Sequence, residues 1–138
     1  MQDTTIKDNM TNRKERLLYS QVECAQNLAS VDDAIYVIGG KWRLKIMIAL
    51  VSGYSSFNEI QRTIKGISAR VLSNELKELE TNGLVERKVD VSRIPVLVEY
   101  IPTQYAETLK NIVNVLGSWG KQHKKMITMQ IRDLSSSL

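Results

Sequence analysis

The stretch that decides the fold is GISARVLSNELKELETNGLVERKVDV, residues 66–91. Within it, leucines recur at helical spacing on one side: Leu72, Leu76 and Leu79. Ser68 stands where a hydroxyl can cap the start of this helix, and Gly83 stands where a glycine can end it with positive φ. After Gly83 the pattern changes to the alternation of a strand that starts at Val85. The stretch therefore predicts a helix followed directly by a β-strand.

Two helices are predicted just upstream. Ser56 and Glu59 have the spacing of a capping box, in which the hydroxyl and the carboxylate each accept a backbone N–H of the other residue. A short helix therefore starts there. An earlier helix begins near Trp42 and ends at Gly53, and its buried face is expected to hold Ile46, Met47, Leu50 and Val51.

The N-terminal part is predicted to contain a polar arm and two helices. Residues 1–10 are the arm, and a weak apolar stripe favours a helix over residues 13–29. Ser30, followed three residues later by Asp33, resembles a capping arrangement that opens a separate short helix. The glycines at 39–40 then end that helix.

Downstream, a hairpin and a long helix are predicted. Val96, Val98 and Tyr100 repeat the alternation after a loop at residues 92–95, so the two strands form a hairpin with a basic tip. A helical pattern then runs from Gln104 to Leu134, with Thr103 as its cap. At 1.5 Å per residue this helix would be about 45 Å long.

The element order predicts a winged helix-turn-helix, a mainly α fold with a small β-hairpin (α+β) and flanking terminal helices. The length of 138 residues suits one folded unit. We expect an N-terminal arm and helix at residues 1–29 and a DNA-binding domain at residues 30–103. Residues 104–138 are expected to form one or more dimerisation helices.

The composition excludes several classes of protein. One cysteine, Cys24, and one histidine, His123, are a poor set for a metal site or a Ser-His-Asp triad, so no metal, cofactor or enzymatic activity is expected. Apolar runs such as residues 46–51 are far shorter than the roughly 20 residues of a membrane span. The polar, mixed-charge N-terminus lacks the features of a secretory signal, which favours the cytoplasm.

Positive charge is concentrated in one part of the chain. Residues 41–77 hold seven basic and two acidic side chains, whereas the whole chain has a net charge of +4. Such a segment is typical of a surface that meets phosphate, so the expected partner is double-stranded DNA. Candidate contacts lie on the helix after Ser68, on the preceding elements and at the hairpin tip. They are Lys41, Arg62, Ser68, Arg70, Ser73, Asn74, Lys77 and Arg93.

The long C-terminal helix predicts a homodimer. It is longer than a small domain can cover, so its apolar stripe needs a partner, and a two-fold dimer is the commonest solution. The candidate interface residues lie on this helix and on the N-terminal one. They are Leu17, Leu18, Ile112, Leu116, Trp119, His123 and Ile127.

A family resemblance rests on a set of motif residues spread over residues 38–120. They are Ile38, Gly39, Gly40, Lys41, Trp42, Phe57, Glu59, Ile60, Arg62, Gly66, Ile67, Ser68, Leu72, Leu76, Leu79, Glu80, Gly83, Leu84, Val85, Arg87, Val98, Glu99, Tyr100, Trp119 and Gly120. Between roughly residues 29 and 120 the chain resembles the HxlR-type winged-helix regulators of bacteria. The resemblance implies a dimeric cytoplasmic transcription regulator whose recognition helix and wing contact operator DNA and whose terminal helices form the dimer.

The chain also departs from the family pattern. Members often carry Cys-Pro ten residues before Gly-Gly, with a thiol that in several of them senses electrophiles or oxidants, whereas Ala29 and Ser30 occupy that place here. Cys24 lies five residues further upstream, so the family's redox role does not transfer to it by position. A regulator that senses an electrophile or oxidant through Cys24 is an alternative hypothesis. Leu97 replaces a basic residue that usually precedes Val-Glu-Tyr, which makes Arg93 the substitute wing contact. A second alternative is a winged-helix module that binds another protein. The sequence does not identify an operator or a small-molecule effector.

Overall fold

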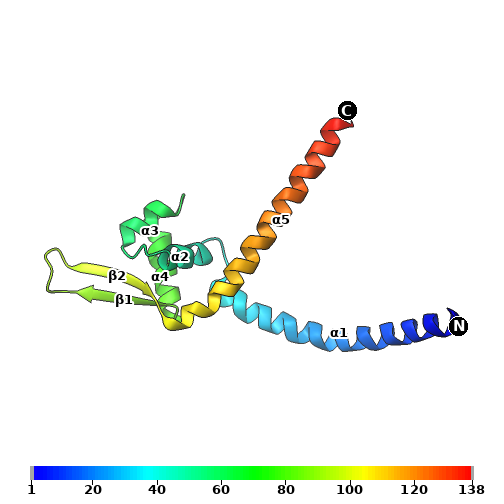
Figure 1. The fold of residues 1–138 in the computed structure, drawn as a ribbon. Coiled ribbons are helices and arrows are strands. Elements are labelled where there is room, and N and C mark those ends of the chain that lie inside the picture. Colours follow the sequence, from blue (N-terminus) through cyan, green and yellow to red (C-terminus); the bar gives the residue numbers. More distant parts are fainter. Residues whose placement is uncertain (1, 138) are drawn as a thin grey trace. The chain divides into compact units, whose positions relative to one another are not determined.

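A computed structural model describes the backbone of residues 2–137 and the side chains of residues 20–137. In chain order (Figure 1) the elements are α1 (Gln2–Ile38), α2 (Arg43–Val51), α3 (Phe57–Thr63), α4 (Ala69–Thr81), β1 (Val85–Asp90), β2 (Leu97–Pro102), the 3-10 helix η1 (Gln104–Thr108) and α5 (Leu109–Ser136). The chain divides into two compact units, residues 1–40 and residues 41–138. A largely helical chain with one two-stranded hairpin confirms the predicted fold class.

The core of the second unit lies among α2, α3 and α4 and continues to the start of β1. Its largest fully buried side chains are Ile46, Met47, Ile60, Leu72, Leu76, Leu79 and Leu84. The predicted leucine face of α4 is therefore confirmed. On α2 the predicted face is confirmed except at Val51, which is half exposed and borders a surface cavity.

The predicted caps set the starts and ends of these helices. At α3 the Glu59 N–H donates to Ser56 Oγ at 3.2 Å, and the Ser56 N–H donates to Glu59 Oε2 at 3.4 Å, which confirms the capping box. Ser68 Oγ accepts the Val71 N–H at 3.2 Å and caps α4. Gly83 has a φ of 76°, which turns the chain from α4 into β1.

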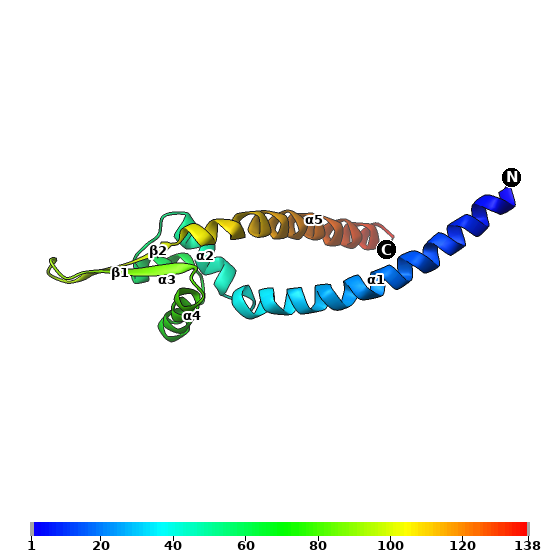
Figure 2. The same ribbon diagram turned by 90° about the horizontal axis from the view of Figure 1, so that it is seen from below.

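The hairpin is anchored at its base and free at its tip. β1 and β2 pair antiparallel, with Val85 opposite Pro102 and Asp90 opposite Leu97. The Thr103 hydroxyl donates to the Gly83 carbonyl at 2.6 Å. Figures 1 and 2 show both strands extending away from α2, α3 and α4. The strands are shorter than predicted at the tip, because residues 91–96 form the loop and the alternation there faces solvent instead of a core.

The predicted break in the N-terminal helix is wrong. α1 runs without interruption from Gln2 to Ile38, so neither a separate polar arm nor a helix start at Ser30 exists. No glycine or proline occurs before Gly39, and a serine in a helix interior costs only a few tenths of a kcal/mol, about 0.5 relative to Ala. The weak capping signal at Ser30 therefore does not stop the helix.

The C-terminal helix starts later than predicted. Thr103 Oγ1 accepts the Ala106 N–H at 3.3 Å, as expected of a cap, but the first turn is the 3-10 helix η1. α5 follows over 28 residues and is about 42 Å long at 1.5 Å per residue.

Candidate nucleic-acid interface

α4 presents a polar face opposite the one that it buries. Leu72, Leu76 and Leu79 point into the core, which leaves the other side of the helix to solvent. Arg70, Asn74 and Lys77 are exposed on that side, and Ser73 is half-buried beside them. These four predicted residues thus lie on one helix face, within about two turns. An α-helix of this kind fits the major groove of B-DNA.

Ser68 is the N-cap residue of α4. Its Oγ accepts the Val71 N–H, so this oxygen is committed to starting α4. The hydroxyl hydrogen is still available, and the side chain is exposed. Ser68 can therefore cap the helix and donate to a phosphate at the same time.

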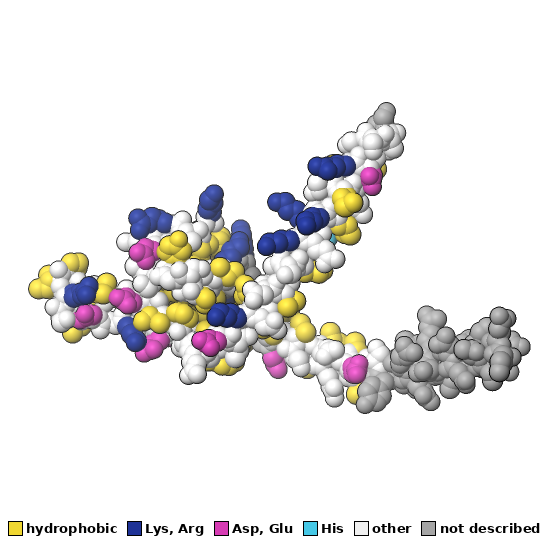
Figure 3. All heavy atoms as spheres, in the orientation of Figure 1, with side chains coloured by type: hydrophobic (Ala, Val, Ile, Leu, Met, Phe, Trp, Pro, Cys, Tyr) yellow, Lys and Arg dark blue, Asp and Glu magenta, His cyan; other side chains and the backbone are white. Residues whose placement is uncertain are grey.

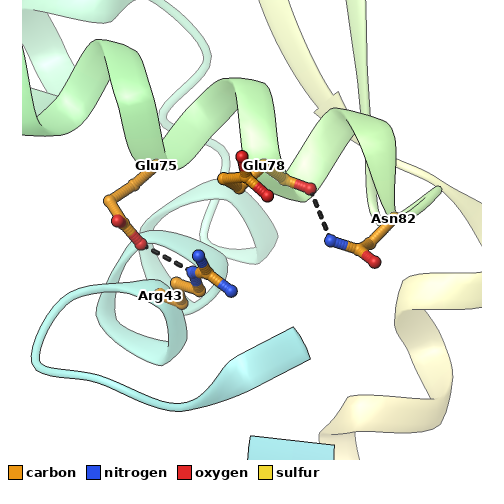
Figure 4. A network of polar contacts seen from close by, with 4 residues as sticks. All are labelled: Arg43, Glu75, Glu78 and Asn82. Atoms are coloured by element: carbon orange, nitrogen blue, oxygen red, sulfur yellow. Dashed lines mark hydrogen bonds and ion pairs between the residues drawn. The ribbon is translucent and has the colours of Figure 1, made fainter. Parts of the chain in front are cut away.

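An ion pair that the sequence did not predict joins α4 to α2 (Figure 4). Arg43 Nε donates to Glu75 Oε2 at 2.7 Å, and the two side chains are only 17% and 23% exposed. At 100° per residue Glu75 lies next to the buried leucine face of α4, at the edge of the core, so this contact helps to fix how the helix is turned relative to α2. The two residues are 32 positions apart, and no local pattern pairs residues at that separation.

Basic side chains surround the start of α2. Lys41 Nζ lies 4.7 Å from the centre of the Trp42 ring and Lys45 Nζ lies 5.3 Å from it, both within cation–π range. Trp42 is half-buried and also lies near Gly66, in the turn before α4. Arg62 is exposed in the last turn of α3. Figure 3 shows Lys and Arg side chains gathered along the edge of α3 and along α5.

The β1–β2 hairpin is the wing of the fold, and its tip at residues 91–96 carries one basic contact candidate and an apolar surface. Arg93 Nε lies 3.6 Å from Asp90 Oδ2, so its charge is partly balanced before any DNA is present. The hydroxyl of Ser92, and then its backbone N–H, donate to Asp90 and lower the pKa of that carboxyl below 3.8. Ile94 is fully exposed, and Val91 is 78% exposed.

The predicted dimer residues on α5 are exposed. Ile112, Leu116, Trp119 and Ile127 form an apolar stripe along α5, and these side chains are 39–63% exposed. The rings of Trp119 and His123 stack with their centres 5.0 Å apart. The side chains of Leu17 and Leu18 lie outside the described residues, so their predicted role is not tested.

A family model described as an HxlR-like helix-turn-helix matches residues 37–136, which include every element from α2 to α5. The chain belongs to this family. One curated relative is the uncharacterised HTH-type transcriptional regulator YdeP of Bacillus subtilis (strain 168). It is 32% identical over 118 residues, which cover 86% of this chain and 90% of the relative.

Solved structures of HTH regulators have the same fold as this HxlR-like chain. The redox regulator HypR in its reduced form is 35% identical, with a TM-score of 0.66, over 71% of this chain and 96% of that one. The HTH-type transcriptional regulator YtcD is 34% identical, also with a TM-score of 0.66, over 69% of this chain and 96% of that one. The predicted family and the winged-helix architecture are therefore confirmed.

The thiol of this HxlR-like chain lies on α1. Cys24 is a free and exposed cysteine.

Within residues 20–137, no group of three or more His, Cys, Asp or Glu side chains is placed to hold a metal ion. No helix in the described part of the chain has the length and apolar character needed to span a bilayer.

Proposed function

We propose that the protein is a dimeric, sequence-specific DNA-binding transcriptional regulator. The observation that carries the proposal is the polar face of α4, where Arg70, Asn74 and Lys77 are exposed opposite three buried leucines. DNA binding is assigned to the winged region within residues 30–103. Dimerisation is assigned to residues 104–138 together with the N-terminal segment over residues 1–29, which lies in α1 from Gln2 onward.

The side chains on α4 have the chemistry of base readout. Arg70 can donate two hydrogen bonds to guanine and Asn74 can pair with adenine, while Ser73 can donate or accept. Lys77, one turn further along, and Arg62 and Lys41 on the flanking elements suit phosphate oxygens. Arg93 would place a guanidinium in a minor groove or on a phosphate.

The apolar stripe of α5 supports a dimer. A partner copy would cover Ile112, Leu116, Trp119 and Ile127, which are otherwise exposed to water. Two copies of α4, the proposed recognition helix, would then be related by a two-fold axis, lie about 34 Å apart and read a palindrome.

The test is a fluorescence-anisotropy titration of the full chain. The DNA probes are the region upstream of its own gene and a scrambled fragment, each at two salt concentrations. If binding is sequence-specific, the protein should still bind the upstream fragment much more tightly than the scrambled one at the higher salt. If only phosphate attraction acts, the affinity for both fragments should fall steeply as salt rises.

Substitutions on α4 separate base readout from a basic surface. Arg70→Ala and Asn74→Ala are each expected to weaken upstream binding by about 10- to 100-fold, or about 1–3 kcal/mol, and to relax specificity. Lys125→Ala on α5 is the control for Arg70→Ala, because it also removes one positive charge but lies away from α4. It should leave the preference for the upstream fragment unchanged. If none of these substitutions changes the DNA signal, the face of α4 does not read DNA, and a protein-binding module becomes the better explanation.

A second candidate function is a response to oxidants through Cys24. It is favoured by the exposure of that thiol and by the likeness to the redox regulator HypR. The measurement is upstream-DNA affinity before and after diamide treatment, for the natural chain and for Cys24→Ser. A loss of affinity in the natural chain that Cys24→Ser prevents supports this function, and an identical response of both proteins rejects it.

A further inference from the structure

A shallow hollow of about 290 Å³ lies on the winged region between α2 and the end of α3, and we call it the α2–α3 hollow. Its floor is apolar, because the buried side chains of Ala49 and Ile64 form it. Ile48 and Tyr54 stand at its edge and are 47% and 43% exposed. The volume is at the lower limit of the range of about 300–1,000 Å³ found for small-molecule sites. The hollow therefore suits the side chains of a short segment better than a drug-sized ligand.

The charge of the α2–α3 hollow is positive. Lys45 and Lys65 line it, and no acidic side chain among the described residues does. Neither lysine belongs to an ion pair among the described residues. Lys45 Nζ lies 5.3 Å from the centre of the Trp42 ring, a contact that leaves the ammonium charged. An occupant that carries carboxylates beside an apolar side chain complements both the charge and the floor.

Two hydroxyls on the wall can accept hydrogen bonds but have already donated their protons. Ser52 Oγ donates to the Ile48 carbonyl at 2.7 Å, and Thr63 Oγ1 donates to the Glu59 carbonyl at 2.8 Å. Each oxygen keeps a lone pair that can accept an N–H. A small carboxylate has no donor for these oxygens, whereas an extended peptide has backbone N–H groups as well as acidic side chains. The polar groups of the hollow therefore match a peptide better than a small organic acid.

We propose that the α2–α3 hollow binds an extended acidic segment of another protein. An apolar side chain of this segment lies on the floor, against Ile48 and Ile64. The carboxylates on either side of it pair with Lys45 and Lys65, and its backbone N–H groups donate to the hydroxyl oxygens.

The hollow faces away from the face of α4 that is assigned to DNA. Arg43 marks the side of α2 that meets α4, because it donates to Glu75. At 100° per residue, Lys45, Ile48 and Ser52 lie about 140–200° around α2 from Arg43. An acidic segment in the hollow can therefore be bound while α4 contacts DNA. This surface gives the protein a second partner besides DNA, and its binding of a peptide does not rest on the proposed function.

The experiment uses a fluorescein-labelled peptide, Asp-Glu-Leu-Glu-Asp, and follows its anisotropy as the full chain is added at low salt. We expect saturable binding. A peptide with its acidic residues replaced by their amides should bind at least about tenfold more weakly, because it loses the attraction to both lysines. A peptide with serine in place of leucine should also bind more weakly, because nothing then covers the apolar floor.

Substitutions in the hollow locate the binding. Lys45→Gln and Lys65→Gln should each weaken binding about threefold, as expected for the loss of one exposed ion pair. Lys121→Gln removes a lysine from α5 outside the hollow and should leave the affinity unchanged. Ile48→Ser should also weaken binding and should make the chain insensitive to the loss of leucine from the peptide. Val91→Ser on the wing is its control, because it also removes an exposed apolar side chain.

Four results would overturn the proposal. Equal affinities of Lys45→Gln, Lys65→Gln and Lys121→Gln would show that the peptide binds elsewhere. Displacement of the peptide by acetate at matched ionic strength would leave only an anion site. Displacement by upstream DNA would make the hollow part of the DNA surface, and a monomeric Ile48→Ser chain in sedimentation velocity would make it part of the dimer.

Absence of peptide binding also rejects the proposal. If upstream-DNA binding is intact in the same preparation, the proposed function stands without this second surface. If the peptide binds and upstream DNA does not, the reverse holds, so the two failures are distinguishable.

Discussion

At the residue scale, the Arg43–Glu75 ion pair is the contact with the clearest energetic consequence. Its guanidinium and carboxylate are both less than one quarter exposed, so water screens them only in part. We expect Glu75→Ala to lower the free energy of unfolding by about 1–2 kcal/mol, as measured by urea denaturation. Glu78→Ala on the same helix is the control, because its exposed carboxylate forms no ion pair among the described residues. A double-mutant cycle with Arg43→Leu that gives no coupling energy would show that the pair does not stabilise α4.

The stability of the wing depends on the ionisation of Asp90. The Ser92 hydroxyl, followed by its backbone N–H, stabilises the charged form of Asp90 and lowers its pKa below 3.8. Because the folded-state pKa is lower than the unfolded value, this turn is stabilised above pH 3.8, and the contribution is lost as the pH falls through the lowered pKa. An NMR titration of the Asp90 carboxyl in Ser92→Ala should show its pKa rising towards 3.8. Ser118→Ala on α5 should leave the titration unchanged, and an unaltered Asp90 titration in Ser92→Ala would contradict this assignment.

At the element scale, the start of α4 tests whether Ser68 acts as a cap, a DNA contact or both. Ser68→Ala removes the acceptor for the Val71 N–H and should cost about 1 kcal/mol in urea denaturation. Ser68→Asp keeps an acceptor and adds a negative charge at a helix N-terminus, so stability should return. The same carboxylate would repel phosphate, so the affinity for upstream DNA should be lower in Ser68→Asp than in Ser68→Ala. Equal DNA affinity of Ser68→Asp and the natural chain would place Ser68 away from the backbone of the DNA.

The elements also show what could be predicted from the sequence. Ser56 and Ser68 gave correct helix starts because each stands at a real change of chain direction, where a cap satisfies free N–H groups. Ser30 has a similar local pattern but lies inside a run without glycine or proline, so the helix continued through it. The positions on α4 could be predicted because helical periodicity places Arg70 and Asn74 opposite the leucines. The Arg43–Glu75 pair could not, because tertiary packing alone brings two residues 32 positions apart together.

At the scale of the whole molecule, the proposed dimer depends on the apolar stripe of α5. Trp119 is 63% exposed in the apolar stripe and far from the core, so Trp119→Asp should leave the winged unit folded. It should make the chain monomeric in sedimentation velocity at micromolar concentration, because a charge in an apolar interface loses its water without gaining a partner. Each monomer would then hold only one half-site, and upstream-DNA affinity should fall at least about tenfold through the loss of bivalent binding. Thr128→Asp is the matched control, since nine residues at about 100° each place it on the opposite side of the helix. It should keep both the dimer and the affinity. A Trp119→Asp chain that still sediments as a dimer would move the interface away from this stripe, and a monomeric variant with full affinity would show that one winged unit is sufficient for DNA recognition.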